Sequence, residues 1–89
     1  SPLPPHATSL PWQEGRFLLL LGERHTRIPA SLHGKLCWIE CTDGTVHLRR
    51  LLTARIFGQY DLQDPFASEP TLQHRELRAA SLVLAILPQ

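Results

Sequence analysis

The chain has little of what several large protein classes require. Among its 89 residues there is no methionine, one lysine (Lys35) and a formal net charge of only +1. Its longest apolar runs, Phe17 to Leu21 and Leu82 to Leu87, are far shorter than the roughly 18 residues that a membrane-spanning helix needs. The sequence therefore predicts no membrane span. The small net charge also removes bulk electrostatics as an argument for binding nucleic acid or anionic lipid.

The size and composition of the chain indicate a single small globular domain. Hydrophobic residues make up 43% of the chain and charged residues 19%, which is too apolar for a disordered polyelectrolyte. Four of the eight prolines fall within the first twelve residues. We expect a proline-rich lead-in or linker over residues 1–8, following an N-terminal module that the chain does not contain, and one β-rich domain over residues 9–89.

Cysteine and histidine are too few and too widely spaced for a metal site. Cys37 and Cys41 are four residues apart, which on one strand places them roughly 13 Å from each other at about 3.3 Å per residue, too far to form a disulfide. We expect two buried, reduced thiols in a cytoplasmic protein. The remaining histidines show no ligand spacing, so the sequence predicts neither a metal nor a cofactor: His6, His25, His33 and His74.

The best-marked element is a β-hairpin around Asp43-Gly44. These two residues separate a run rich in β-formers, 35–41, from a second run, 46–56. An Asp-Gly pair in this setting predicts a type I′ turn, which needs positive φ at both central residues. On the returning strand, His47, Arg49 and Leu51 should share one face, with the alternate residues on the other.

Shorter signals mark the rest of the chain. The predicted elements are a buried strand at 17–21, a loop or irregular edge strand at 23–33, a strand at 60–62 and a loop at 64–70. Leu72 to Leu87 fits a helix and also a strand from about Glu76; the hairpin context favours the strand. The expected fold is thus mostly β, a small single domain of curved antiparallel sheets or a partly open barrel.

Six motifs follow one another along almost the whole chain: Ser9-Leu10-Pro11, Gly15-Arg16-Phe17-Leu18-Leu19-Leu20, Gly34-Lys35-Leu36-Cys37-Trp38-Ile39, Thr45-Val46-His47-Leu48-Arg49-Arg50-Leu51, Tyr60-Asp61-Leu62-Gln63-Asp64-Pro65 and Glu76 to Leu87. In order and spacing they resemble the β-domain of LexA-like repressors and signal-peptidase-type serine proteases. No catalytic signature of that family is intact. Its two Gly-Asp pairs are here Gly-Arg and Gly-Lys.

The resemblance implies that Ser9 stands at the nucleophile position and that Arg49 replaces the lysine base. An arginine stays protonated in proteins and cannot accept the serine proton. His47, on the same strand face as Arg49, is the alternative general base. The competing structural interpretations are an ordinary linker serine for Ser9 and a solvated sheet surface for His47 and Arg49.

Three functions follow from these residues. The preferred hypothesis is a catalytically degenerate association domain that pairs with itself or with another protein through its last strand at Leu82, Leu84 and Ile86, as in the C-terminal domain of a prokaryotic or phage transcription regulator. The first alternative is a minimal serine peptidase using Ser9 and His47.

The second alternative is a small OB-like or SH3-like barrel that binds nucleic acid or a peptide. It would use arginines at 49, 50, 55, 75 and 78 together with Trp38, Phe57 and Tyr60. Arg49 and Arg50 are neighbours on a strand and must point to opposite sides. The sequence therefore argues against direct binding of nucleic acid.

Overall fold

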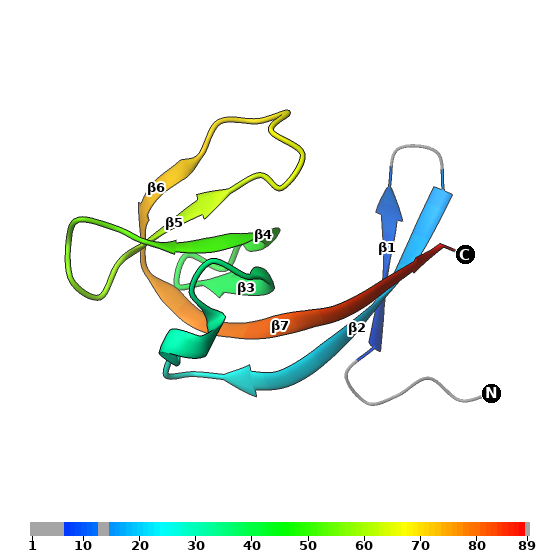
Figure 1. Cartoon of the computed structure of the whole chain (residues 1–89), viewed down its shortest axis with the longest axis horizontal. Coiled ribbons are helices and arrows are strands. Elements are labelled where there is room, and N and C mark those ends of the chain that lie inside the picture. The colour runs from blue at the N-terminus through cyan, green and yellow to red at the C-terminus, as the bar shows by residue number, and fades with distance from the viewer. Residues whose placement is uncertain (1–6, 13–14, 89) are drawn as a thin grey trace.

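The computed structural model describes residues 7–12 and 15–88, which fold into antiparallel β-structure with one short 3-10 helix (Figure 1). The elements are β1 (Ala7–Trp12), β2 (Gly15–His25), η1 (Ala30–Leu32), β3 (Leu36–Cys41), β4 (Val46–Thr53), β5 (Tyr60–Gln63), β6 (Leu72–Arg75) and β7 (Leu77–Pro88). The prediction of a mostly β fold is confirmed. The strand prediction for the last segment is confirmed too, and its helical alternative is wrong.

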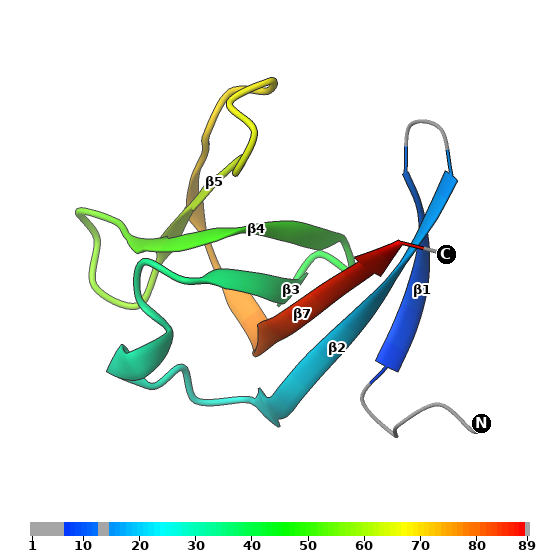
Figure 2. The same ribbon diagram turned by 45° about the vertical axis from the view of Figure 1, so that its right-hand side comes forward.

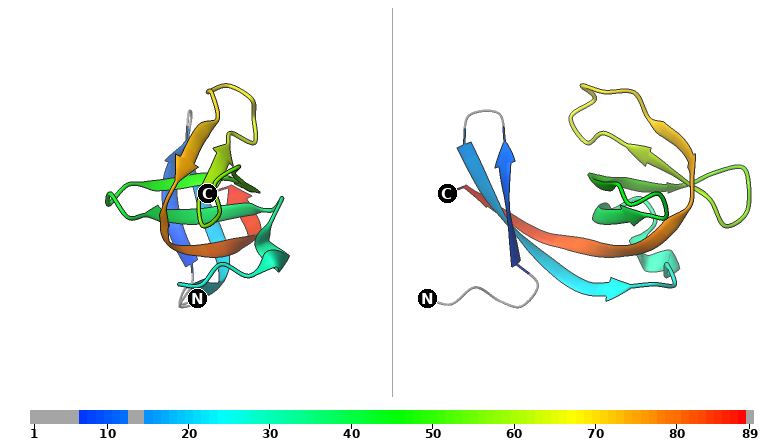
Figure 3. Two further views of the ribbon diagram at one scale, coloured as in Figure 1. Left: turned by 90° about the vertical axis from the view of Figure 1, so that its left-hand side faces the viewer. Right: turned by 180° about the vertical axis from the view of Figure 1, so that it is seen from behind.

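All seven strands belong to one sheet, in the order β1-β2-β7-β3-β4-β5-β6 with every neighbouring pair antiparallel. The sheet is open, because β1 and β6 stand at the two ends of this order. It is also strongly curled. Figures 1 and 3 show β6 running into β7 as one ribbon that bends round β3, β4 and β5.

The bend between β6 and β7 is fixed by hydrogen bonds to residues of other segments. His74 has a φ of +56°, a left-handed conformation that histidine tolerates better than bulkier residues do. Its N–H donates to Asp61 Oδ1 at 3.0 Å. The carbonyl of Glu76, the residue between the two strands, accepts from the N–H of Thr42 at 3.1 Å. The chain thereby passes from the side of β5 to the side of β3, and the sheet encloses a core.

The core lies inside this curl and is made of small and medium-sized apolar side chains. Alternate residues of β3 are buried, as a two-residue period requires. The buried cluster is Leu32, Cys37, Ile39, Cys41, Leu51, Leu62 and Ala80. Leu32 comes from η1, in the segment predicted as a loop or irregular edge strand.

β7 is buried on both faces where it crosses the curl. Ala80 faces the core, while Ala79 and Ser81 face outward and are nevertheless buried. Their strand neighbours Glu40 and Arg24 form an ion pair at 2.7 Å. Because paired residues share a face, this ion pair spans β7 above the two small residues. The small side chains of 79–81 thus let β7 occupy the centre of the sheet.

The β3–β4 hairpin confirms the predicted position and corrects the predicted turn type. Gly44 has a φ of +89°, but Asp43 is not among the described residues with positive φ, so the turn is not type I′. The N–H of Gly44 donates to the carbonyl of Cys41, and the N–H of Cys41 to the carbonyl of Thr45. This is a three-residue loop with a left-handed glycine. Asp43 departs from the prediction because its carboxylate accepts the Thr45 N–H at 2.9 Å.

Two further expectations are corrected in the N-terminal half. β2 is much longer than the predicted 17–21 strand, because it continues beside β7 as far as His25. The Ser9-Leu10-Pro11 motif, which in the family forms the turn that carries the nucleophile, lies here in β1, where Ser9 pairs with Leu18. Of the predicted lead-in, residues 1–6 lie outside the described part of the chain, and β1 begins at Ala7.

Candidate functional site

Beyond the curl, three strands continue as an outer arm made of β1, β2 and the outer half of β7. Figure 2 shows β2 and β7 running side by side toward this end of the molecule, with β1 beside β2. The pairing of β7 with β3 ends at Leu82, whereas its pairing with β2 continues to Pro88. Among the described strands, residues 84–87 of β7 therefore have a neighbour on the β2 side alone.

This geometry corrects the predicted association edge in one respect. Leu82 pairs with Cys37 of β3 and packs, partly buried, against the core, so it does not lie on a free strand edge. Leu84 and Ile86 lie on the outer half of β7 and are 62% and 39% exposed. The edge character that the sequence assigned to all three residues therefore applies to Leu84 and Ile86.

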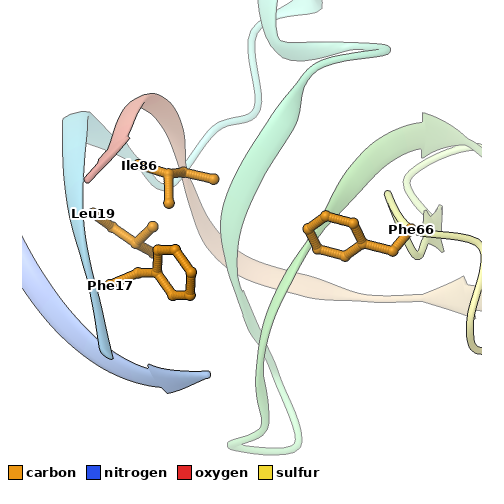
Figure 4. Close-up of a pocket in the computed structure, with 4 residues that line it drawn as sticks. All are labelled: Phe17, Leu19, Phe66 and Ile86. Carbon is orange, nitrogen blue, oxygen red and sulfur yellow. The ribbon is translucent and has the colours of Figure 1, made fainter. Parts of the chain in front are cut away.

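An apolar groove lies between the outer arm and the β5–β6 loop. It has a volume of about 200 Å³ and is lined by Phe17, Leu19, Phe66 and Ile86. Leu19 and Ile86 are directly paired on β2 and β7 and form the floor with Phe17. Figure 4 shows these three side chains together and the ring of Phe66 pointing toward them from across the groove.

The loop that carries Phe66 is built around Asp64. The carboxylate of Asp64 accepts hydrogen bonds from the backbone N–H of Phe66 (3.0 Å), Ser68 (3.0 Å) and Glu69 (2.9 Å), and from the Ser68 hydroxyl (2.6 Å). The Ser68 hydroxyl, followed by the backbone donors, lowers the pKa of this carboxyl below its usual value. With four donors bonded to one side chain, the β5–β6 loop (residues 64–71) has a defined conformation and forms the wall of the groove that carries Phe66.

Arg49 holds this wall in place. Its side chain is buried and its guanidinium donates to Glu69 Oε2 at 2.6 Å, to the carbonyl of Pro70 at 3.1 Å and to that of Leu62 at 3.4 Å. Two of these acceptors, Glu69 and Pro70, lie in the loop. The buried guanidinium is therefore hydrogen-bonded to the loop, and its positive charge is paired with the Glu69 carboxylate. The interpretation of Arg49 as part of a solvated surface is therefore wrong; Arg49 faces the interior and docks the β5–β6 loop.

His47 faces the same side of β4 as Arg49, as predicted, and is half-buried. Its Nε2 lies 3.0 Å from Thr45 Oγ1, whose hydroxyl donates to Asp43 at 2.6 Å. Burial lowers the pKa of His47, and the positive charges of Arg49 and Arg75 lower it further. An imidazole in this setting is neutral near neutral pH and hydrogen-bonded within its own hairpin.

The predicted Ser9 and His47 belong to strands far apart in the sheet. Ser9 is on β1 and His47 on β4, and β2, β7 and β3 stand between those strands in the pairing order. For Ser9 the structure describes the backbone alone, which pairs with Leu18. The side chain of His47 is hydrogen-bonded to Thr45. The Ser9–His47 pair stays a prediction.

The two cysteines are free and buried, as the sequence predicts, on one face of β3. Burial raises the pKa of the Cys37 thiol to about 11 and also raises that of Cys41. Both thiols are thus protonated and unreactive at neutral pH. Within the described ranges, no group of three or more histidine, cysteine, aspartate or glutamate side chains could hold a metal ion.

Sequence reasoning missed the groove. Phe66 stands in a segment with the composition of a loop, 64–70, and this composition gives no sign of an aromatic wall. Leu19 is fully buried, as the predicted buried strand requires, but Phe17 is half-buried, and both line the groove. The one available signal was an aromatic residue between Asp64-Pro65 and Glu69-Pro70, in a loop that turn chemistry can make rigid.

Comparison with known proteins assigns no family to this chain. No protein-family model, no curated protein and no solved structure matches it. The resemblance to LexA-like repressors and signal peptidases therefore stays a prediction. In the described part of the chain, no helix is both long and apolar enough to cross a membrane.

Proposed function

We propose that this domain associates with a second copy of itself through the apolar groove and the outer half of β7. The observation that carries the proposal is the arrangement of side chains at this end of the sheet. Phe66 and Ile86 are exposed and line an apolar groove, and Leu84 is exposed on the adjoining segment of β7, which is paired on one side. Such edges and apolar patches are surfaces that another chain can cover.

The charge pattern supports an apolar contact there. Residues 82–88 and 17–21 contain no charged side chain. A strand edge that must stay unpaired in solution is usually protected by lysine or other charges, or by proline. Here Pro88 alone could play that part, at the last residue of β7. The lack of protecting charges favours a covered edge.

A role in catalysis has less support. Arg49, at the position of the family's lysine base, is engaged with the β5–β6 loop, and His47 is hydrogen-bonded within its hairpin. We therefore propose an association domain in which peptidase chemistry is lost. The finer assignments, a cytoplasmic location and a place in a transcription regulator, belong to this proposal and derive from the two reduced thiols and the family resemblance.

The test is the molar mass in solution, measured by light scattering over a range of concentrations. We expect the wild-type chain to exceed its monomer mass of 10.1 kDa as concentration rises, and Leu84→Arg to stay at that mass. Val46→Arg is the control, because Val46 is also an exposed aliphatic residue on a strand but lies on β4, outside the outer half of β7 and the groove lining. A wild-type chain that stays monomeric throughout would refute the proposal.

A further inference from the structure

We infer that the side chain filling the groove is Phe57 of a second copy, so that copies join head to tail. This inference rests on the proposed self-association and names its contact. Phe57 lies at the tip of the β4–β5 connection and is fully exposed, with a relative accessibility of 103%. Ile56, beside it, is 53% exposed. Phenylalanine is among the aromatic residues that are enriched in the cores of protein–protein interfaces.

The tip that carries Phe57 is preorganised. The N–H of Gln59 donates to the carbonyl of Ile56 at 3.1 Å, and the N–H of Ala54 to that of Gln59 at 3.2 Å. Gly58 has a φ of +84°, which makes Ile56–Gln59 a type II turn with Phe57 at its first corner. Because the turn is already closed by hydrogen bonds, its backbone loses little conformational entropy when Phe57 binds. This lower entropic cost favours affinity.

The groove has the size and chemistry of a phenyl site. It measures about 200 Å³ and its described lining is entirely aliphatic and aromatic. A cavity of roughly 150 Å³ with the same kind of lining binds benzene in an engineered protein. The rings of Phe17 and Phe66 would also offer edge-to-face partners to an incoming ring.

The two features lie at opposite ends of the molecule. Figure 1 shows the β4–β5 connection at one end of the long axis and the outer arm at the other. The molecule measures 43 Å along its longest axis, so one copy cannot place its own Phe57 in its own groove. Each copy can therefore insert its Phe57 into the groove of one neighbour and receive the Phe57 of another neighbour in its own groove. Such a heterologous contact gives a ring if its rotation closes and a chain if it does not.

Charges beside the two halves are complementary. Arg55 is exposed next to the Phe57 turn. In the loop beside the groove, Glu69 is paired with Arg49, whereas the carboxylate of Asp64 accepts from the uncharged donors of Phe66, Ser68 and Glu69, so the loop keeps the negative charge of Asp64. A head-to-tail contact brings the arginine of one copy toward the acidic loop of the next, which favours this pairing over tail-to-tail contacts.

The test uses two variants that each lack one half of the contact. Phe57→Ser removes the ring, and Ile86→Arg blocks the groove. We expect each variant alone to associate at least roughly tenfold more weakly than wild type. An equimolar mixture should form a species of twice the 10.1 kDa chain mass, because one intact ring meets one intact groove. Val46→Ser, the control, removes an exposed apolar side chain outside both halves and should associate like wild type.

The outcomes separate this inference from the proposed function. If Phe57→Ser associates as well as wild type while Ile86→Arg does not, self-association stands and the Phe57 contact is refuted. If both variants are monomeric and their mixture is too, the head-to-tail pairing is refuted. A monomeric wild type refutes both. Circular dichroism checks folding, and Phe66→Arg, at a 60% exposed position, replaces Ile86→Arg if the latter does not fold.

Discussion

Arg49 shows how one residue can be correctly placed by sequence and wrongly interpreted. Alternation along the strand puts it on the same face as His47, and the structure agrees. Its partner Glu69, however, is twenty residues away in a loop with no periodicity of its own. No pattern within one strand can reveal that pairing, because it depends on how the β5–β6 connection folds over the sheet. In the structure, the residue that the resemblance places at the position of the catalytic base docks the β5–β6 loop.

Arg49 and its neighbour Arg50 form a matched pair for testing this role. Arg49→Ala leaves the carbonyls of Leu62 and Pro70 without a donor in a buried place, so we expect the free energy of unfolding to fall by about 2 kcal/mol. Arg50 is exposed and donates to the carbonyl of Gly34. Arg50→Ala should change stability by less than about 0.5 kcal/mol. Urea denaturation measures both; equal effects would contradict the docking role.

His47 gives the folded state a dependence on pH. Burial, with help from Arg49 and Arg75, lowers its pKa below the ordinary 6.5. Well above pH 6.5 neither the folded nor the unfolded state binds a proton there. As the pH falls below 6.5, the unfolded chain takes up a proton that the folded state resists, so stability decreases. We expect His47→Gln to lose less stability than wild type between pH 7 and pH 5 in urea titrations; an identical loss would refute this assignment.

At the scale of elements, the hairpin and the last strand could be predicted and the turn type could not. Asp43-Gly44 marks the reversal, but its conformation is decided by whether the Asp43 carboxylate bonds the next strand, which a dipeptide signal does not contain. The pattern of Leu72 to Leu87 fits both a helix and a strand, because β7 is apolar on both faces, and only the hairpin context favours the strand. β7 is apolar on both faces because it lies in the centre of the sheet, between β2 and β3. The sequence of a single segment cannot predict this pairing order.

Substitutions at Gly44 and Gly22 distinguish the cost of a left-handed backbone conformation from the cost of a steric clash. A Cβ at Gly44 would meet nothing within 4 Å, yet its φ of +89° is unfavourable for other residues. Gly44→Ala should therefore cost about 1 to 2 kcal/mol. Gly22 lies in β2 without positive φ, and a Cβ there makes ordinary contacts at 3.7 Å with Leu82. Gly22→Ala should leave stability unchanged or raise it by up to about 1 kcal/mol. The reverse order in thermal or urea denaturation would contradict the turn assignment.

At the scale of the whole molecule, the chain divides its apolar residues between two tasks. Those of β3, β4 and β5 fill the core inside the curl. Those at the ends of β2 and β7 line the groove that the Asp64 loop closes from the other side. Fold class follows from alternation and turns, which are local. The groove does not, since its lining comes from three segments that meet only after the sheet has curled.

The most direct test of the central claim is an NMR dilution series on the labelled chain, following the methyl and amide signals of Leu84 and Ile86. The account predicts that these signals shift progressively as concentration rises, while those of Val46 stay fixed. That result would show both that copies associate and that the groove end is where they meet. Signals at Leu84 and Ile86 that remain constant over the whole range, or shifts confined to Val46 and its neighbours, would contradict it.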